Sequence, residues 1–137
     1  MNTHSAVNPI KRLAYAFVGL LVGDAMLFLY LLLNALQGLT LYAIFSLIGW
    51  LFVGVPVVLF LPARSVTRWS WPFSIAVGAF LGPPALLVVL VLLGRGHIHF
   101  PASFVGTGPM FAFSIFVSTV SFGVYVALLR KQLGGTN

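Results

Sequence analysis

The chain has one acidic residue, Asp24, and it lies near the middle of the long apolar run 13–33. A charged side chain at the bilayer centre costs roughly 2.5–3.5 kcal/mol on insertion scales. The apolar runs contain no Lys, Arg or His that could pair with it, so we expect the neutral, protonated form. Two interpretations stay open. Asp24 is either a proton or cation site, or a neutral acid that fixes helix packing through hydrogen bonds.

Unusual residues occur at one depth in all four apolar runs. Counting inward from the basic end of each run, at about 1.5 Å per residue in a helix, brings them to the bilayer centre. In the last run, Ser114, Ser118 and Ser121 recur at intervals of four and three, which places them on one helix face. We expect Asp24 to bond to these hydroxyls, to an indole, or to carbonyls freed by a proline pair near the same depth. The predicted midplane site consists of Asp24, Trp50, Pro83, Pro84, Ser114, Ser118 and Ser121.

Catalytic and metal-binding groups are scarce. His97 and His99 alternate in one loop and are weak candidates for a metal site, but the one carboxylate lies too deep to be a third ligand. The absence of cysteine excludes thiolate and iron–sulfur sites. No histidine lies in an apolar run, which excludes an intramembrane Ser–His dyad and a two-His haem site. We expect no enzymatic activity and no metal or other cofactor, because such chemistry needs at least two cooperating polar groups.

The elements that carry these residues are membrane-spanning helices. Of the 137 residues, 61% are hydrophobic and 6% charged, whereas soluble domains have about a quarter charged residues. Each apolar run can cross a hydrocarbon core of about 30 Å, and lipid offers no partner for backbone N–H and C=O groups, so the runs must be helical. We predict an all-α membrane protein, a four-helix bundle forming one membrane domain. Its spans are 13–33, 39–61, 72–93 and 109–129, with an outer loop at 94–108.

Basic residues predict the orientation of the bundle. Six of the seven Lys and Arg residues flank the spans on one side, and only Arg95 lies on the other. Because positive charge resists translocation, we expect both termini to be cytoplasmic, in a bacterial inner membrane or a plasma membrane. Trp69 and Trp71, beside this basic side, are expected to anchor in the head-group layer. Insertion and anionic lipids account for the net charge of +6, so no nucleic-acid partner is expected.

Small residues on the first span predict a close helix contact. Gly19 and Gly23 have the GxxxG spacing that lets two helix backbones approach each other. The partner helix belongs either to the same bundle or to another copy of the chain. Because Asp24 follows this strip directly, we expect its side chain to face a helix interface.

These features favour a non-catalytic integral membrane protein that acts as an accessory or interaction subunit of a membrane assembly. In that role Asp24 and the glycine strip would set helix contacts. The alternative is a small proton- or cation-coupled carrier or channel in which Asp24 binds the ion, Pro83 and Pro84 form a hinge, and the serines line the path. The expected partners are the lipid bilayer and either a membrane protein or further copies of the chain in a parallel homo-oligomer.

Overall fold

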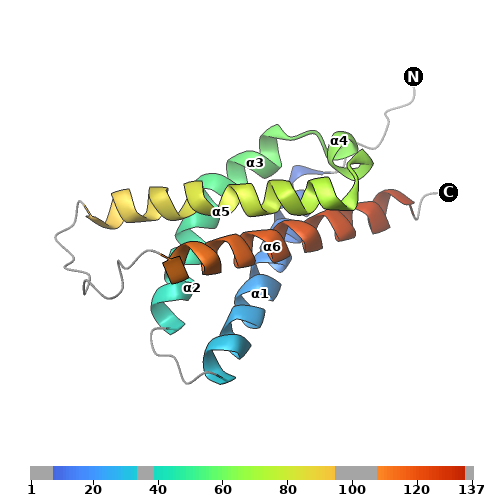
Figure 1. Cartoon of the computed structure of the whole chain (residues 1–137). Helices are drawn as coiled ribbons and strands as arrows, with labels where there is room; N and C mark the ends of the chain where they lie inside the picture. Colours follow the sequence, from blue (N-terminus) through green and yellow to red (C-terminus); the bar gives the residue numbers. More distant parts are fainter. Residues whose placement is uncertain (1–7, 34–38, 95–107, 135–137) are drawn as a thin grey trace.

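The computed structural model describes residues 8–33, 39–94 and 108–134, and these are almost entirely helical (Figure 1). Four stretches are long and apolar enough to cross a membrane, at Pro9–Leu33, Tyr42–Phe60, Trp71–Leu92 and Met110–Gly134. The predicted all-α architecture with four spans is therefore confirmed. His97, His99 and Arg95 lie outside the described residues. The elements are α1 Pro9–Leu33, α2 Leu39–Gly49, the π-helical η1 Trp50–Gly54, α3 Val55–Phe60, α4 Ala63–Arg68, α5 Trp71–Gly94 and α6 Gly108–Gly134.

The first helix begins four residues before the predicted start at Leu13. The side-chain oxygen Oδ1 of Asn8 accepts a hydrogen bond from the backbone N–H of Ile10 at 3.0 Å, which is the contact of an N-cap residue. Pro9 occupies the first helical position, where a missing N–H removes no helical bond. The Asn8-Pro9 pair therefore starts the helix ahead of the basic residues, and Lys11 and Arg12 lie within its first turn.

The second span is helical throughout but changes its hydrogen-bond register halfway. In η1 the backbone N–H of Val55 bonds to the carbonyl of Trp50, five residues earlier. Pro56 follows at once and has no N–H to donate to the carbonyl four residues before it. A single π-helical turn at this point lets the chain continue as a helix through α3.

The long C-terminal helix α6 is the central element of the bundle. Helices α1 and α5 both pack along it, and Figure 1 shows α5 and α6 side by side with α1 crossing at an angle. Several side chains of α6 are fully or nearly fully buried, among them Tyr125, Val126 and Leu129. The segments α2, η1 and α3 complete the bundle against α1 and α5.

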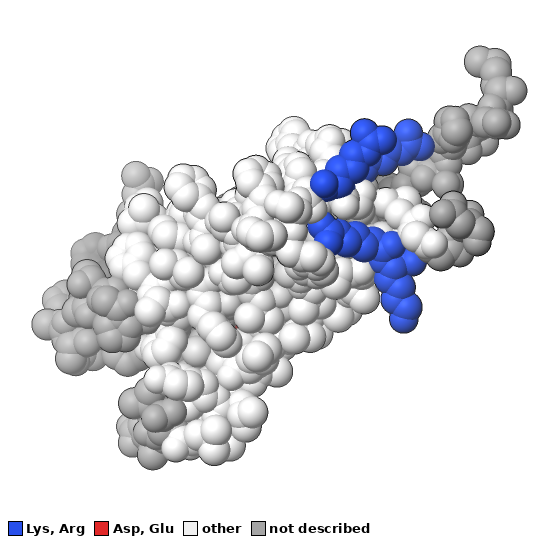
Figure 2. Space-filling model, turned by 45° about the vertical axis from the view of Figure 1, so that its right-hand side comes forward, with Lys and Arg blue, Asp and Glu red and all other residues white. Residues whose placement is uncertain are grey.

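Basic side chains gather at one end of the described structure (Figure 2). Arg12 donates hydrogen bonds from Nη2 to the carbonyls of Val58 and Leu61, at the C-terminal end of α3. Its Nε and Nη2 also lie 3.3 Å from the hydroxyl of the buried Tyr125 on α6. Since the last carbonyls of a helix lack partners and carry partial negative charge, Arg12 fastens α1, α3 and α6 together at this end.

A second arginine makes a similar contact at the same end. Arg130 of α6 donates to the carbonyl of Trp69, which ends α4, and its guanidinium lies 4.5 Å from the centre of the Trp71 ring. Trp71 is exposed, whereas Trp69 is half-buried against Phe73, with the ring centres 4.9 Å apart. The two tryptophans thus differ, because Trp71 is more exposed than Trp69.

Candidate functional site

The hydrogen-bond partner of Asp24 in the described structure is Ser46 of α2. The hydroxyl of Ser46 donates to Oδ2 of Asp24, with 2.6 Å between the oxygens. Both residues are half-buried at the contact between α1 and α2. The sequence analysis did not name Ser46. It proposed the indole of Trp50, the serines of α6 and proline-freed carbonyls, none of which bonds to Asp24 among the described contacts.

The predicted partner Trp50 and the observed partner Ser46 differ by one helical turn, since Ser46 precedes Trp50 by four residues. Trp50 instead packs against Phe17, which lies about two turns before Asp24 on α1. Counting residues inward from the ends of the apolar runs therefore placed Asp24 one turn away from its actual partner on the second span.

The three predicted serines of α6 do not meet Asp24. Ser114 donates to the carbonyl of Gly82 on α5 at 2.6 Å, and Ser118 donates to the carbonyl of Ile115 in its own helix at 3.0 Å. The hydroxyl oxygen of Ser121 is buried and has no hydrogen-bond partner. It lies 2.8 Å from the position that a Cβ on Gly23 would occupy. The residues of the predicted midplane site therefore lie in two places, with Asp24 at the α1–α2 contact and the serines on α6.

Pro83 and Pro84 lie within α5, which continues through them without a break from Trp71 to Gly94. The proline-freed carbonyls were predicted to bond to Asp24, whereas the carbonyl directly before the prolines, that of Gly82, accepts a hydrogen bond from Ser114. Neither proline lines the two hollows described below, and Pro84 is exposed. Of the predicted midplane residues, Ser114 lies nearest to them, through its hydrogen bond to the preceding Gly82.

Two pairs of glycines bring helices α1 and α5 onto α6. A Cβ on Gly23 would lie 2.9 Å from the carbonyl oxygen of Val117, and a Cβ on Gly19 would overlap the carbonyl of Ser121. The Gly19–Gly23 strip therefore contacts α6 of the same chain. A second GxxxG spacing, Gly78 and Gly82 on α5, escaped the sequence analysis. A Cβ on Gly82 would lie 2.7 Å from the carbonyl oxygen of Ser114. Two faces of α6 thus require glycine opposite them.

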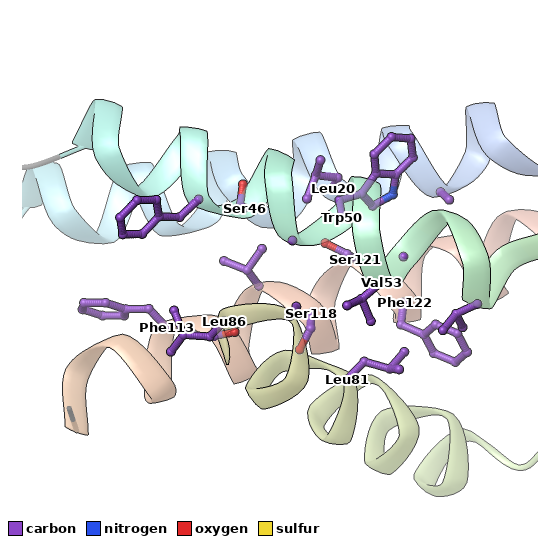
Figure 3. A pocket seen from close by; sticks show the side chains of 18 of the residues that line it. Leu20, Ser46, Trp50, Val53, Leu81, Leu86, Phe113, Ser118, Ser121 and Phe122 are labelled. Carbon is purple, nitrogen blue, oxygen red and sulfur yellow. The ribbon is translucent and has the colours of Figure 1, made fainter. Parts of the chain in front are cut away.

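A cavity of about 130 Å³ lies among the spans, and Ser46, Trp50 and Ser121 are among the residues of its wall that Figure 3 labels. Its walls come from α1, α2, η1, α3, α5 and α6, and they include Ser114, Ser118 and Ser121. Trp50 forms part of the wall and packs edge-on against Phe17, with the ring centres 5.5 Å apart. The remaining walls are mostly apolar, with Val53, Leu81 and Phe122 among them.

Asp24 lines a second hollow, between α1 and α2, together with Phe28 and Ala43. Leu27 and Tyr42 line both this hollow and the cavity among the spans. The Asp24–Ser46 hydrogen bond accordingly lies between the two spaces. One acid with a hydroxyl partner can exchange a proton or remain a fixed hydrogen bond.

The described residues contain no group of three His, Cys, Asp or Glu side chains that could hold a metal ion. The weak candidates His97 and His99 fall outside this part of the chain. Comparisons with models of protein families, with curated proteins and with solved structures find no match to the chain. Any assignment of function therefore rests on the geometry of the residues described above.

Proposed function

We propose that the chain is a non-catalytic integral membrane protein that serves as an accessory or interaction subunit of a membrane assembly. The observation that carries this proposal is the use of Asp24, the one acid of the chain, in a hydrogen bond to Ser46. A carboxyl held in this way fixes the contact between α1 and α2. The apolar spans contain no pair of cooperating catalytic groups, and the connections between them are short, which agrees with this role.

The proposal includes an orientation with both termini in the cytoplasm of a bacterial cell or on the cytoplasmic side of a plasma membrane. Its support is the gathering of Lys and Arg at the end where α1 starts and α6 finishes (Figures 1 and 2). Lys and Arg flanking a span are retained on the cytoplasmic side during insertion. The arginine contacts to the ends of α3 and α4 belong to the same end.

The surface available to a partner is the lipid-facing perimeter of the spans. The glycine strip of α1 contacts α6, so a bulky residue at Gly23 would disturb the bundle itself and would not report on a partner. Exposed side chains on the outer helices serve better, for example Leu29 of α1 at 56% exposure and Phe80 of α5 at 78%. A photo-crosslinking amino acid at each position samples a different face in native membranes.

The interaction role predicts that one of these faces forms a defined protein adduct, of a size identified by mass spectrometry, while the other face labels lipid. The adduct should persist in the variant Asp24→Asn, because an amide also accepts the hydrogen bond from Ser46. Adducts to lipid alone from both faces, and from further exposed positions around the bundle, would count against an interaction subunit.

A proton- or cation-coupled carrier is the second candidate, and one observation favours it. The Asp24–Ser46 pair lies between two hollows that share Leu27 and Tyr42 in their walls. An ion passing from one hollow to the other would meet the carboxyl. In this function the protein would act as a parallel homo-oligomer, since the one-sided basic residues favour a single orientation.

Proteoliposomes separate the two functions without knowledge of a substrate. A carrier gives pH-dependent flux of protons or cations that is abolished in Asp24→Asn, whereas an accessory subunit gives no flux above that of this variant. Labelling by a hydrophobic carbodiimide adds an independent reading. A carboxyl in a fixed hydrogen bond stays unlabelled from about pH 5 to 9, a range that includes the pKa values known for buried carboxyl groups in proteins. A carboxyl that carries ions is labelled to an extent that changes with pH.

A further inference from the structure

The cavity among the spans is a feature that the proposed function does not use. Its volume of about 130 Å³ is close to that of the roughly 150 Å³ apolar cavity that holds one benzene molecule. Pockets for drug-sized molecules are larger, at roughly 300–1,000 Å³. The space therefore suits one ring or a short length of hydrocarbon chain.

The polar groups in the cavity wall are mostly turned toward protein acceptors. Ser46 donates to Asp24, Ser114 to the carbonyl of Gly82, and Ser118 to the carbonyl of Ile115. These three hydroxyl protons are not available to a guest in the cavity. A polar or ionic guest would lose its hydration without gaining a full set of new partners.

The remaining hydroxyls of the α6 wall are also directed away from a guest. The oxygen of Ser121 is buried at the α1 contact, next to the missing side chain of Gly23. The hydroxyl of Tyr125 accepts hydrogen bonds from Arg12. What faces the space is chiefly hydrocarbon and aromatic surface, of which Val53, Leu81 and Leu86 are labelled in Figure 3.

The location of the walls identifies the source of the guest. Every residue that lines the cavity belongs to a segment able to cross the membrane or to the turn within the second span. The cavity is only partly enclosed, and all of its walls belong to segments that would be surrounded by the hydrocarbon of a bilayer. The molecules present there at high concentration are lipid acyl or isoprenoid chains.

We propose that this cavity binds a single hydrocarbon chain of a membrane lipid, inserted between the second span and helices α5 and α6 beside Trp50. The lipid chain fills apolar space, so that the side chains of the cavity wall gain contacts on the side that faces the cavity. This binding site is independent of the accessory role and of ion transport. It makes the protein a lipid-binding bundle whose packing includes a bilayer component.

Quenching of Trp50 fluorescence tests this binding. The double variant Trp69→Phe, Trp71→Phe leaves Trp50 as the one indole, since the chain contains three tryptophans. The protein is reconstituted in bilayers containing phospholipids brominated in the inner half of the acyl chain. We expect strong quenching by these lipids, and loss of most of that quenching when Val53→Phe fills the cavity.

Leu51→Phe is the matched control, because residue 51 lies on the same segment but is 55% exposed and is not part of the cavity wall. It should leave the quenching unchanged. Equal quenching in the Val53→Phe and parental proteins would overturn the proposal, as would stronger quenching by aqueous acrylamide, which indicates a water-filled cavity. If Val53→Phe does not fold, Ala85→Leu fills the same space from α5 and carries the same expectation.

Discussion

Replacing Gly23 by alanine should loosen the contact between α1 and α6. The added Cβ would lie 2.9 Å from the carbonyl oxygen of Val117 and 2.8 Å from the hydroxyl of Ser121, against an ordinary contact of at least 3.4 Å. The Ser121 hydroxyl can rotate away, but the Val117 carbonyl belongs to the backbone of α6 and cannot. Helix α1 must therefore move away from α6 by about half an ångström at this contact.

The magnitude follows from comparison with a second glycine that has no such neighbour. A Cβ on Gly123 of α6 would meet nothing within 4 Å. Alanine in a helix interior is favoured over glycine by roughly 0.5–1 kcal/mol, and this gain applies to both positions. Gly123→Ala should thus stabilise the protein, whereas Gly23→Ala adds an overpacking cost of about 1–3 kcal/mol. The free energies of unfolding of the two variants should differ by that cost.

Unfolding by sodium dodecyl sulfate in mixed micelles, followed by tryptophan fluorescence, measures this difference. The dodecyl sulfate midpoint should fall for Gly23→Ala and stay constant or rise for Gly123→Ala. Equal midpoints for the two variants would refute the argument that α1 approaches α6 closely at Gly23. A rise in both would mean that helix preference alone decides the stability of the bundle.

Three further predictions concern the basic end of the bundle. Arg12→Gln should lower the free energy of unfolding by about 1.5–3 kcal/mol, because hydrogen bonds from a charged group are lost. The control Lys11→Gln removes the same charge from an exposed side chain and should have little effect in the same unfolding assay. Tyr125→Phe should cost about 1 kcal/mol in the parental protein and less in the Arg12→Gln background, because the two residues share one contact; equal costs would contradict that coupling. Ser65→Cys introduces the one cysteine of the chain, in α4, and a membrane-impermeant maleimide should label it in inverted vesicles but not in intact cells if the basic end is cytoplasmic.

The spans could be predicted from the sequence because lipid imposes a simple rule. Backbone groups in hydrocarbon need internal hydrogen bonds, so long apolar runs become helices whatever their exact residues. The register between helices obeys no such rule. It depends on how the side chains of neighbouring helices pack, and here Asp24 lies beside Ser46 while Trp50 packs against Phe17.

The course of the proline-containing spans and the use of hydroxyls were harder to predict. The second span contains a π-helical turn just before Pro56, whereas α5 remains α-helical through Pro83 and Pro84. Proline therefore has a different effect on the backbone in the two spans. The even spacing of the serines on α6 is real, but a serine in a membrane helix can bond to its own backbone, as Ser118 does. Spacing alone therefore did not reveal which acceptor each hydroxyl uses.

The central position of α6 has a consequence for how the protein is made. Helix α6 leaves the ribosome after α1 and α5, yet it is the element onto which both of them pack through their glycine strips. The three earlier spans enter the membrane before their main packing surface exists. Until α6 has been made, the glycine strips of α1 and α5 lack the surface against which they pack. A truncation within α6 is therefore expected to remove the main contact of both earlier helices.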